Sequence, residues 1–274
     1  MDISFLKSFD YWDFRKNIKG LSQKYPFISV DSIGKSVMGK EIFALTLGKA
    51  DECALFVGGI HGPDSFSSGL LAAFFEELCD AVESDGAIEG LKVRKALWGR
   101  ALTIIPCLNP DGCEIASKGK AGCGNRLEEI KNISGFDFKK FSTNARGVDI
   151  DLNFSGRSAL SEPESHALSV FVKEHNIRHS LVFGSGNGEL ITPGGEKIPA
   201  RSSRMTEIMT ATTGYNISFN KNDRRREGFM DWFCGEFFKP AFKILPTVPE
   251  QMKESDYIKV YKNLRELMML TSIM

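Results

Sequence analysis

His61 and Asp64 lie three residues apart in Gly59–Asp64, a short turn sequence flanked by glycine. An imidazole and a carboxylate are both side chains that bind divalent metal ions. Taken alone, His61 is better explained as a turn histidine that hydrogen-bonds to the backbone. The pair is therefore a candidate metal site whose remaining ligands must come from elsewhere in the chain.

Four further segments place polar side chains beside glycine or proline, as loops that carry chemistry often do. They are Asn109–Gly112, Asn144–Asp149, Gly184–Glu189 and Gly228–Phe233. Each is a weak signal by itself, because the same residues also form ordinary turns. Their order along the chain, and their place after predicted strands, carries more information than any single segment.

Short buried strands must position these residues. Five apolar runs bounded by Gly, Pro or charged residues predict such strands: Ile42–Leu47, Ala54–Gly58, Ala101–Pro106, Ser180–Phe183 and Ala241–Leu245. His61 follows the second run closely, and Gly184–Glu189 follows the fourth. Ligands in α/β sheets bind beyond the carboxyl ends of the strands, so we expect the site at that edge.

Two amphipathic segments between these strands predict helices. Ser67–Val82 has apolar residues three and four positions apart, which gives one buried helical face. Ser165–Glu174 predicts a second helix, and the residues before it carry start signals. Ser161 is the expected N-cap, Pro163 lies in the first turn and Glu164 closes a capping box. The alternation predicts an α/β fold, a mixed and mostly parallel twisted sheet with helices on both faces.

No linker, repeat or low-complexity tract divides the 274 residues, so we expect one domain over residues 1–274. Lys plus Arg and Asp plus Glu both number 35, which gives no basic excess for binding nucleic acid or a membrane surface. No apolar run approaches the roughly 18 residues of a membrane span, and no secretory segment is evident. We therefore expect a soluble, cytoplasmic protein, with its six cysteines as free thiols.

Taken in order, the polar segments resemble the zinc carboxypeptidase family, the carboxypeptidase A-like metallopeptidases. The similarity is strongest to the compact bacterial branch that acts on peptides or peptidoglycan stem peptides. It covers about residues 11–246. The matching motifs are Tyr25-Pro26, Ile33–Ser36, His61-Gly62, Asn109–Gly112, Asn144–Asp149, Ser161–Glu164, Asp231–Phe233 and Lys239-Pro240. Eight ordered matches imply the single-domain fold of that family.

The resemblance implies zinc held by His-x-x-Glu and a second histidine, with water in the fourth position. His61 matches the first ligand, and Asp64 stands where the glutamate belongs. Ser185 occupies the place of the second histidine, and a neutral hydroxyl is a poor zinc ligand. Asp149 matches the carboxylate that orients the first histidine. His179 does not replace the lost ligand, because it lies six residues before Ser185, roughly 20 Å along an extended strand.

The positions that the resemblance assigns to catalysis also differ. The last strand reads Phe242–Pro246 where the family has Phe-Thr-Ile-Glu, so Leu245 replaces the general base. Leucine cannot take a proton from water. Arg146 matches the arginine that stabilises the oxyanion or holds a carboxylate, and its plain alternative is a surface ion pair.

Substrate binding would use a different set of charges from the family's. Asp151-Leu152 aligns with the Asn-Arg pair that grips the terminal carboxylate of the substrate, so a basic residue is lost and an acidic one gained. Arg146 and Asp151 belong to the predicted substrate-binding set. Three consecutive arginines at the expected rim of the cleft complete it: Arg224, Arg225 and Arg226. Guanidinium groups suit the capture of carboxylates.

Three functions remain open at this point. The first is a catalytically impaired homologue that binds a peptide or a peptidoglycan stem-peptide fragment, with zinc bound weakly or not at all. The second is an active metallocarboxypeptidase or amide hydrolase with a rearranged metal site, for example His61 and Asp64 with Glu189 recruited. The third is an interaction scaffold with a vestigial site, its cleft filled by Leu152 or Leu245. The sequence leaves the oligomeric state open.

Overall fold

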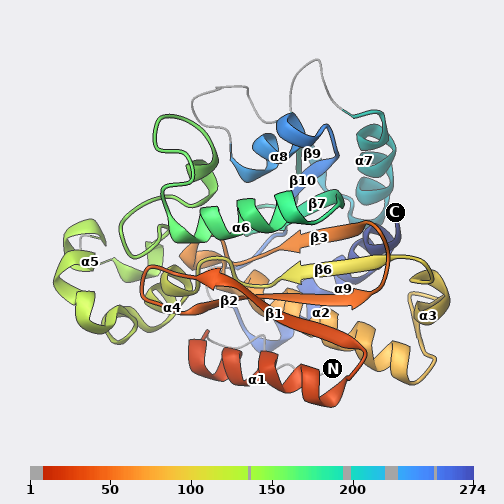
Figure 1. Cartoon of the computed structure of the whole chain (residues 1–274), viewed down its shortest axis with the longest axis horizontal. Coiled ribbons are helices and arrows are strands. Elements are labelled where there is room, and N and C mark those ends of the chain that lie inside the picture. The colour runs from red at the N-terminus through yellow and green to blue at the C-terminus, as the bar shows by residue number, and fades with distance from the viewer. Residues whose placement is uncertain (1–8, 135–136, 194–198, 220–227, 250–251) are drawn as a thin grey trace.

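The computed structural model describes residues 9–134, 137–193, 199–219, 228–249 and 252–274. Within these residues an eight-stranded sheet forms the centre, in the order β1-β2-β6-β3-β7-β10-β8-β9 (Figure 1). In chain order its strands are β1 Ile28–Lys35, β2 Glu41–Gly48, β3 Cys53–Val57, β6 Ala101–Ile105, β7 Ile177–Phe183, β8 Glu189–Thr192, β9 Asn216–Phe219 and β10 Ala241–Leu245. A separate pair joins β4 Ala87–Ile88 to β5 Leu91–Lys92.

The four central strands β6, β3, β7 and β10 run parallel to one another. Antiparallel pairs flank them, since β2 lies antiparallel to both β1 and β6, and β8 lies antiparallel to β10. This confirms the predicted mixed, mostly parallel sheet, and all five predicted strands occur. We did not predict β1, β8 or β9, whose residues are largely exposed or half-buried, so the continuous apolar run of a central strand is absent from them.

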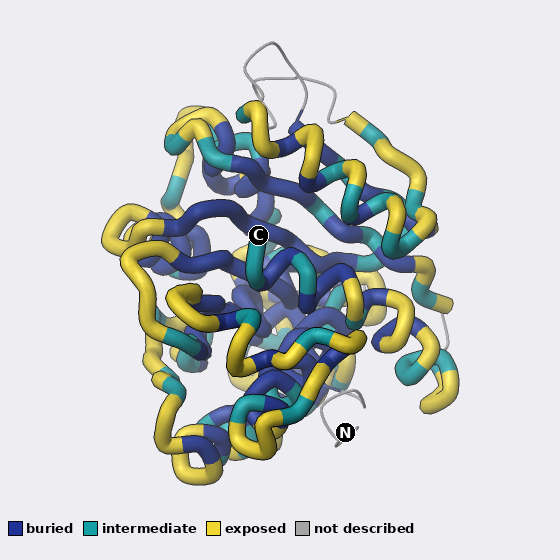
Figure 2. The backbone as a smooth tube through the Cα atoms, turned by 90° about the vertical axis from the view of Figure 1, so that its right-hand side faces the viewer, coloured by how far each residue is buried: buried dark blue, intermediate teal, exposed yellow. Residues whose placement is uncertain are grey.

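Helices cover both faces of the sheet, as predicted. The residues of β3 alternate between two cores: Ala54 and Phe56 join one, while Leu55 and Val57 join the other. The first core is covered by α1 Tyr11–Lys24, α2 Ser65–Glu83, α3 Val93–Ala96, α7 Ala200–Thr213 and α9 Glu254–Ile273. The second is covered by α6 Pro163–Glu174, which crosses the near face in Figure 1, and by α8 Phe229–Phe237. In Figure 2 the buried stretches of backbone lie in the interior, and exposed stretches lie at the periphery.

Two more helices, α4 Pro110–Lys118 and α5 Leu127–Ser134, lie to one side of the sheet (Figure 1). They follow β6 along the chain. A small third core joins this region, built around residues such as Ile115 and Ile130. Asn109 caps α4, because its side chain accepts a hydrogen bond from the backbone of Gly112.

The predicted helix Ser67–Val82 is confirmed as α2, which begins two residues earlier. The predicted start of α6 is wrong in its details. Its N-cap is Glu162, not Ser161, and no side chain caps it. Glu164 does not close a capping box, because its carboxylate accepts the backbone N–H of Val37 at 3.0 Å. A partner distant in the chain thus replaces the expected local one.

All six cysteines are free and buried, which confirms the thiol prediction. They are Cys53, Cys79, Cys107, Cys113, Cys123 and Cys234. Each behaves as a small apolar residue of the core. Throughout the described ranges, no helix combines the length and the apolar character needed to cross a membrane.

Candidate functional site

The candidate site lies at the carboxyl edge of the central strands. β3 ends at Val57, four residues before His61, and β7 ends at Phe183, two residues before Ser185. Leu245 is the last residue of β10. Because β3, β7 and β10 run parallel, these three residues meet at one edge of the sheet.

His61 lies between two carboxylates. Its Nδ1 is 3.3 Å from Oδ2 of Asp64, and its Nε2 is 3.2 Å from Oδ1 of Asp149. Burial acts to lower the pKa of His61, but hydrogen bonds to Asp149 and Asp64 outweigh it and raise that pKa to about 10. At neutral pH the ring is therefore a cation that donates from both nitrogens. Burial acts to raise the pKa of Asp149, but the hydrogen bond from His61 and the charge of that ring outweigh it. The pKa of the Asp149 carboxyl is therefore below its ordinary value.

The turn that carries His61 is shaped by close backbone packing. A Cβ at Gly62 would collide with the carbonyl oxygens of Phe141 and Gly112, so only glycine fits there. Asp64 ends the short 3₁₀ helix Gly62–Asp64 and leads directly into α2. Its backbone carbonyl accepts the hydroxyl of Ser67 at 2.7 Å. These contacts place the Asp64 carboxylate against the imidazole.

Leu245 and Asp64 both approach Gly184, the residue before Ser185. A Cβ built on Gly184 would be 3.0 Å from Cδ2 of Leu245 and 3.1 Å from Oδ2 of Asp64, so both side chains approach this one glycine. The Ser185 Oγ is buried and has no hydrogen-bond partner in the described part of the chain. An apolar group and an unpaired hydroxyl thus occupy the positions that the family pattern gives to a base and a ligand.

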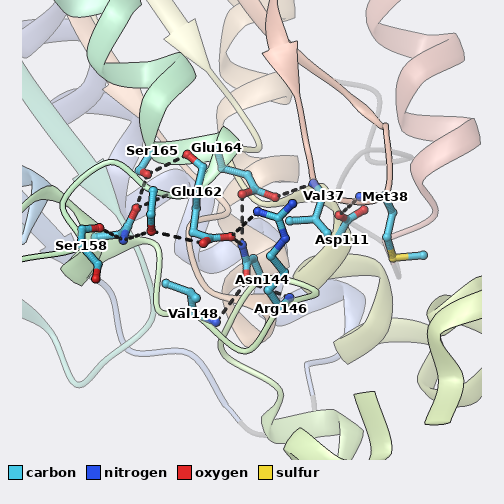
Figure 3. Close-up of polar contacts among 12 residues, drawn as sticks. Val37, Met38, Asp111, Asn144, Arg146, Val148, Ser158, Glu162, Glu164 and Ser165 are labelled. Carbon is cyan, nitrogen blue, oxygen red and sulfur yellow. Dashed lines mark hydrogen bonds and ion pairs between the residues drawn. The ribbon is translucent and has the colours of Figure 1, made fainter. Parts of the chain in front are cut away.

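The loop that supplies Asp149 is held by buried polar side chains (Figure 3). The Asn144 amide donates to Glu162 at 2.8 Å and to Glu164 at 3.2 Å. Its oxygen accepts the backbone N–H groups of Arg146 and Val148 at 3.0 and 3.1 Å. One buried side chain therefore closes the loop and ties it to the start of α6 (Figure 3).

Arg146 projects from this loop toward Glu162. Its Nη1 is 3.4 Å from Oε2 of Glu162, and its side chain is 51% exposed. The ion pair is loose, and much of the guanidinium faces solvent. The proposed contact of Arg146 with an oxyanion or a carboxylate stays a prediction.

Asp151 is buried and paired with Lys243, a residue that the sequence reading did not single out. Its Oδ2 accepts the Lys243 ammonium, and its Oδ1 accepts the backbone N–H of Phe229 at 3.1 Å. Both carboxylate oxygens are therefore engaged within the protein. A lysine inside the apolar run Ala241–Leu245, two residues from Leu245 and so on the same sheet face, was the signal available in the sequence.

The remaining proposed site residues are Glu189, Leu152 and the three consecutive arginines. Glu189 pairs directly with Leu245 across β8 and β10, so both side chains leave the same face of the sheet. Leu152, at the family's clamp position, is 41% exposed. Arg224, Arg225 and Arg226 lie outside the described residues.

A cavity of about 510 Å³ lies at the opposite edge of the sheet, away from His61. Cys53, Ala101 and Asn176 line it, at or just before the first residues of β3, β6 and β7. None of the candidate site residues around His61 lines this cavity. Across the described ranges, no group of three or more His, Cys, Asp or Glu side chains is arranged to hold a metal ion.

Known proteins resemble this chain in sequence and in fold. The sequence model of the zinc carboxypeptidase family matches residues 15–241. Gamma-D-glutamyl-L-diamino acid endopeptidase 1 of Lysinibacillus sphaericus is 23% identical over 281 aligned positions, covering 93% of this chain and 70% of that protein.

Two solved structures share the fold. Bovine thrombin-activatable fibrinolysis inhibitor, in complex with tick carboxypeptidase inhibitor, superposes with a TM-score of 0.74 at 14% identity, over 98% of this chain and 97% of that one. Murein-tripeptide amidase MpaA from Escherichia coli O157 gives a TM-score of 0.55 at 15% identity, over 89% and 90%. The family match spans most of the chain. The matched residues include His61 and Asp149, which are in contact in the structure. This protein therefore belongs to the zinc carboxypeptidase family.

Proposed function

We propose that this protein binds a peptide or a peptidoglycan stem-peptide fragment and does not hydrolyse it by the family's zinc-dependent route. One observation carries the proposal. His61 contacts Asp64 and Asp149, and the Leu245 side chain approaches the same glycine, Gly184, as the Asp64 carboxylate. The buried hydroxyl of the next residue, Ser185, has no partner among the described residues. This set keeps the first histidine of the family pattern and its carboxylate partner. It lacks the second histidine and the general base.

The donor set does not fit a catalytic zinc ion, which takes three protein ligands and a water. His61 and Asp64 supply two donor side chains of suitable type. At the third position, Ser185 offers a neutral hydroxyl where the family has an imidazole. Bound zinc lowers the pKa of water to about 7, so a site without the ion loses the means of making hydroxide at neutral pH.

Leu245 removes a second component of the reaction. A positioned general base contributes about 10²–10⁴-fold to such reactions, or roughly 3–5 kcal/mol. Both losses act on the same step. A single altered ligand is compatible with a different metal, whereas the loss of ligand, base and carboxylate clamp together supports binding without cleavage.

The class of ligand follows from the relatives. The Lysinibacillus sphaericus protein is named as a gamma-D-glutamyl-L-diamino acid endopeptidase, and the Escherichia coli protein as a murein-tripeptide amidase. The first name specifies a bond between γ-D-glutamate and a diamino acid, and the second specifies a murein tripeptide. A stem-peptide fragment is therefore the first ligand to test for this chain.

The test combines three measurements on the purified full chain. We expect calorimetry to detect binding of the tripeptide alanyl-γ-D-glutamyl-lysine, elemental analysis to find far less than one zinc per chain, and chromatography to find no cleavage. Arg146→Ala should weaken the binding about 10-fold if the guanidinium contacts the ligand. Near-stoichiometric zinc together with turnover would contradict the proposal, and absence of binding would favour an interaction scaffold.

A second candidate function is an amide hydrolase with a rearranged site. The register of β8 and β10 favours it, because Glu189 lies directly opposite Leu245 and presents a carboxylate on the same face. In that case Glu189→Gln should abolish turnover of the tripeptide while leaving its binding intact. If the wild-type chain shows no turnover with added zinc, this candidate is excluded.

A further inference from the structure

Lys243 is a buried cation for which the family pattern has no counterpart. Its side chain is 19% exposed and leaves β10 on the same face as Leu245, at the edge where His61 lies. An ammonium group has three N–H donors. Asp151 is the polar partner that the structure places beside it within the described residues, so two donors have no protein acceptor there.

Asp151 positions this ammonium and has little capacity left for a ligand. Its side chain is only 6% exposed, and its second oxygen is held by Phe229 at the N-terminus of α8. A Cβ at Gly228 would lie 2.8 Å from that carboxylate, so glycine permits the approach. The Phe229 N–H therefore holds Asp151 in place, and Lys243 is the more exposed member of the pair.

The surroundings keep Lys243 charged. Burial acts to lower its pKa, but the charge of Asp151 and the hydrogen bond to it outweigh burial, with smaller effects from Asp231 and Asp149, so the pKa is raised. Asp149 is itself compensated by His61 and by the backbone N–H of Asp151. Two N–H donors of the ammonium are thus available to a ligand, because the carboxylates nearby already have partners.

We propose that Lys243 is the cation that holds the terminal carboxylate of the bound peptide, through a hydrogen bond donated by its ammonium. This assignment rests on the proposed binding function and specifies how the ligand is held. In the family pattern an arginine at the position of Leu152 grips that carboxylate. Here the cation comes from β10, and the Asp151-Leu152 segment supplies the carboxylate that orients it.

The test compares two forms of one probe, alanyl-γ-D-glutamyl-lysine with a free terminal carboxylate and the same peptide as a terminal carboxamide. We expect the wild-type chain to bind the acid about 10- to 100-fold more tightly than the amide, as a charged hydrogen bond of this kind implies. Lys243→Met should remove the preference, so that the variant binds acid and amide about equally. Lys173→Met, an equal charge change at an exposed position of α6, should keep it.

Lys243→Met leaves Asp151 buried without its cation, so the double variant Lys243→Met/Asp151→Asn provides a second test without that unpaired charge. Circular dichroism should show that it is folded, and it too should bind acid and amide equally. Retention of the wild-type preference in a folded variant would overturn the assignment while the proposed function stands. Equal binding of both forms by the wild type would do the same, and binding of neither form would overturn the proposed function itself.

Discussion

At the scale of single residues, His61 keeps the carboxylate partner that the family pattern implies, while other residues of that pattern are replaced. The contact between Nε2 and Asp149 matches the orienting bond that metal-binding histidines usually make. On its other nitrogen lies Asp64, one methylene shorter than the family's glutamate. The surroundings of one metal-binding histidine are therefore present. The family's second histidine and its general base are replaced, by Ser185 and Leu245.

Restoring the family's residues is a direct test of this interpretation. The triple variant Asp64→Glu/Ser185→His/Leu245→Glu should retain about one zinc per chain after dialysis, because it regains three protein ligands. Wild type should retain far less, as measured by elemental analysis. The matched control, Asp64→Glu/Leu245→Glu, keeps Ser185 and should remain low in zinc. A folded triple variant without zinc would show that the lost residues do not account for the lost site.

At the scale of elements, β7 and α9 are joined by a buried histidine and arginine. The Nε2 of His179 lies 2.8 Å from the carbonyl oxygen of Thr271, and Arg178 donates to the carbonyls of Ala101 and Ser272. The bonds to Thr271 and Ser272 satisfy carbonyls in the last turn of α9, which have no partner within the helix. Burial lowers the pKa of His179 to about 3, so the folded chain holds this ring neutral.

Acid should therefore destabilise the chain through His179. The unfolded chain protonates this residue near pH 6.5 and the folded chain only near pH 3, so unfolding takes up a proton between these values. Stability from this source is complete above pH 6.5 and is lost as the pH falls. At pH 5 the loss is about 2 kcal/mol.

The measurement compares urea unfolding of wild type and His179→Gln at pH 7 and pH 5. Glutamine can still donate to Thr271 but does not titrate, and the carboxylates shared by both chains cancel in the difference. We expect the variant to lose about 2 kcal/mol less than wild type between the two pH values. Equal losses would show that His179 is not the group that couples this interface to pH.

The elements also show where local signals were sufficient. Central strands such as β3 and β6 were predicted because burial on both faces requires a continuous apolar run. The edge strand β1 was missed because its polar residues face solvent. The start of α6 was misplaced because Asn153 accepts both the Glu162 N–H and the Ser165 hydroxyl, which replaces the expected local cap.

At the scale of the whole molecule, the core is large enough to stand without disulfides. All six thiols are buried, and burial raises the pKa of thiols such as those of Cys79, Cys113 and Cys234. A buried, protonated thiol is a poor nucleophile. The six cysteines should therefore report on global unfolding.

We expect a thiol reagent to label none of the six cysteines rapidly at neutral pH in the folded chain, and all six in concentrated guanidinium chloride. Intact-mass spectrometry counts the added groups. The control is the same labelling after reduction, which should give an identical count. A lower count in the unfolded, unreduced chain would reveal a disulfide and contradict the buried free thiols.

The sequence by itself determined the fold class, the family and the identity of most of the polar residues near His61. Buried strands and amphipathic helices have periodic patterns that neighbouring residues create, and the family motifs are local strings such as Asn144–Asp149. The replacements at Ser185 and Leu245 can likewise be read directly from the chain.

Only the tertiary structure decided which charges meet. Asp151 and Lys243 are 92 residues apart, and their pairing depends on how β10 and the loop before α6 are placed together. Glu189 faces Leu245 because of a strand register that neither segment encodes alone. Electrostatic interactions act through space at distances of a few ångströms, whereas sequence patterns record neighbours along the chain. The charge pairs of this site could therefore be identified only from the tertiary structure.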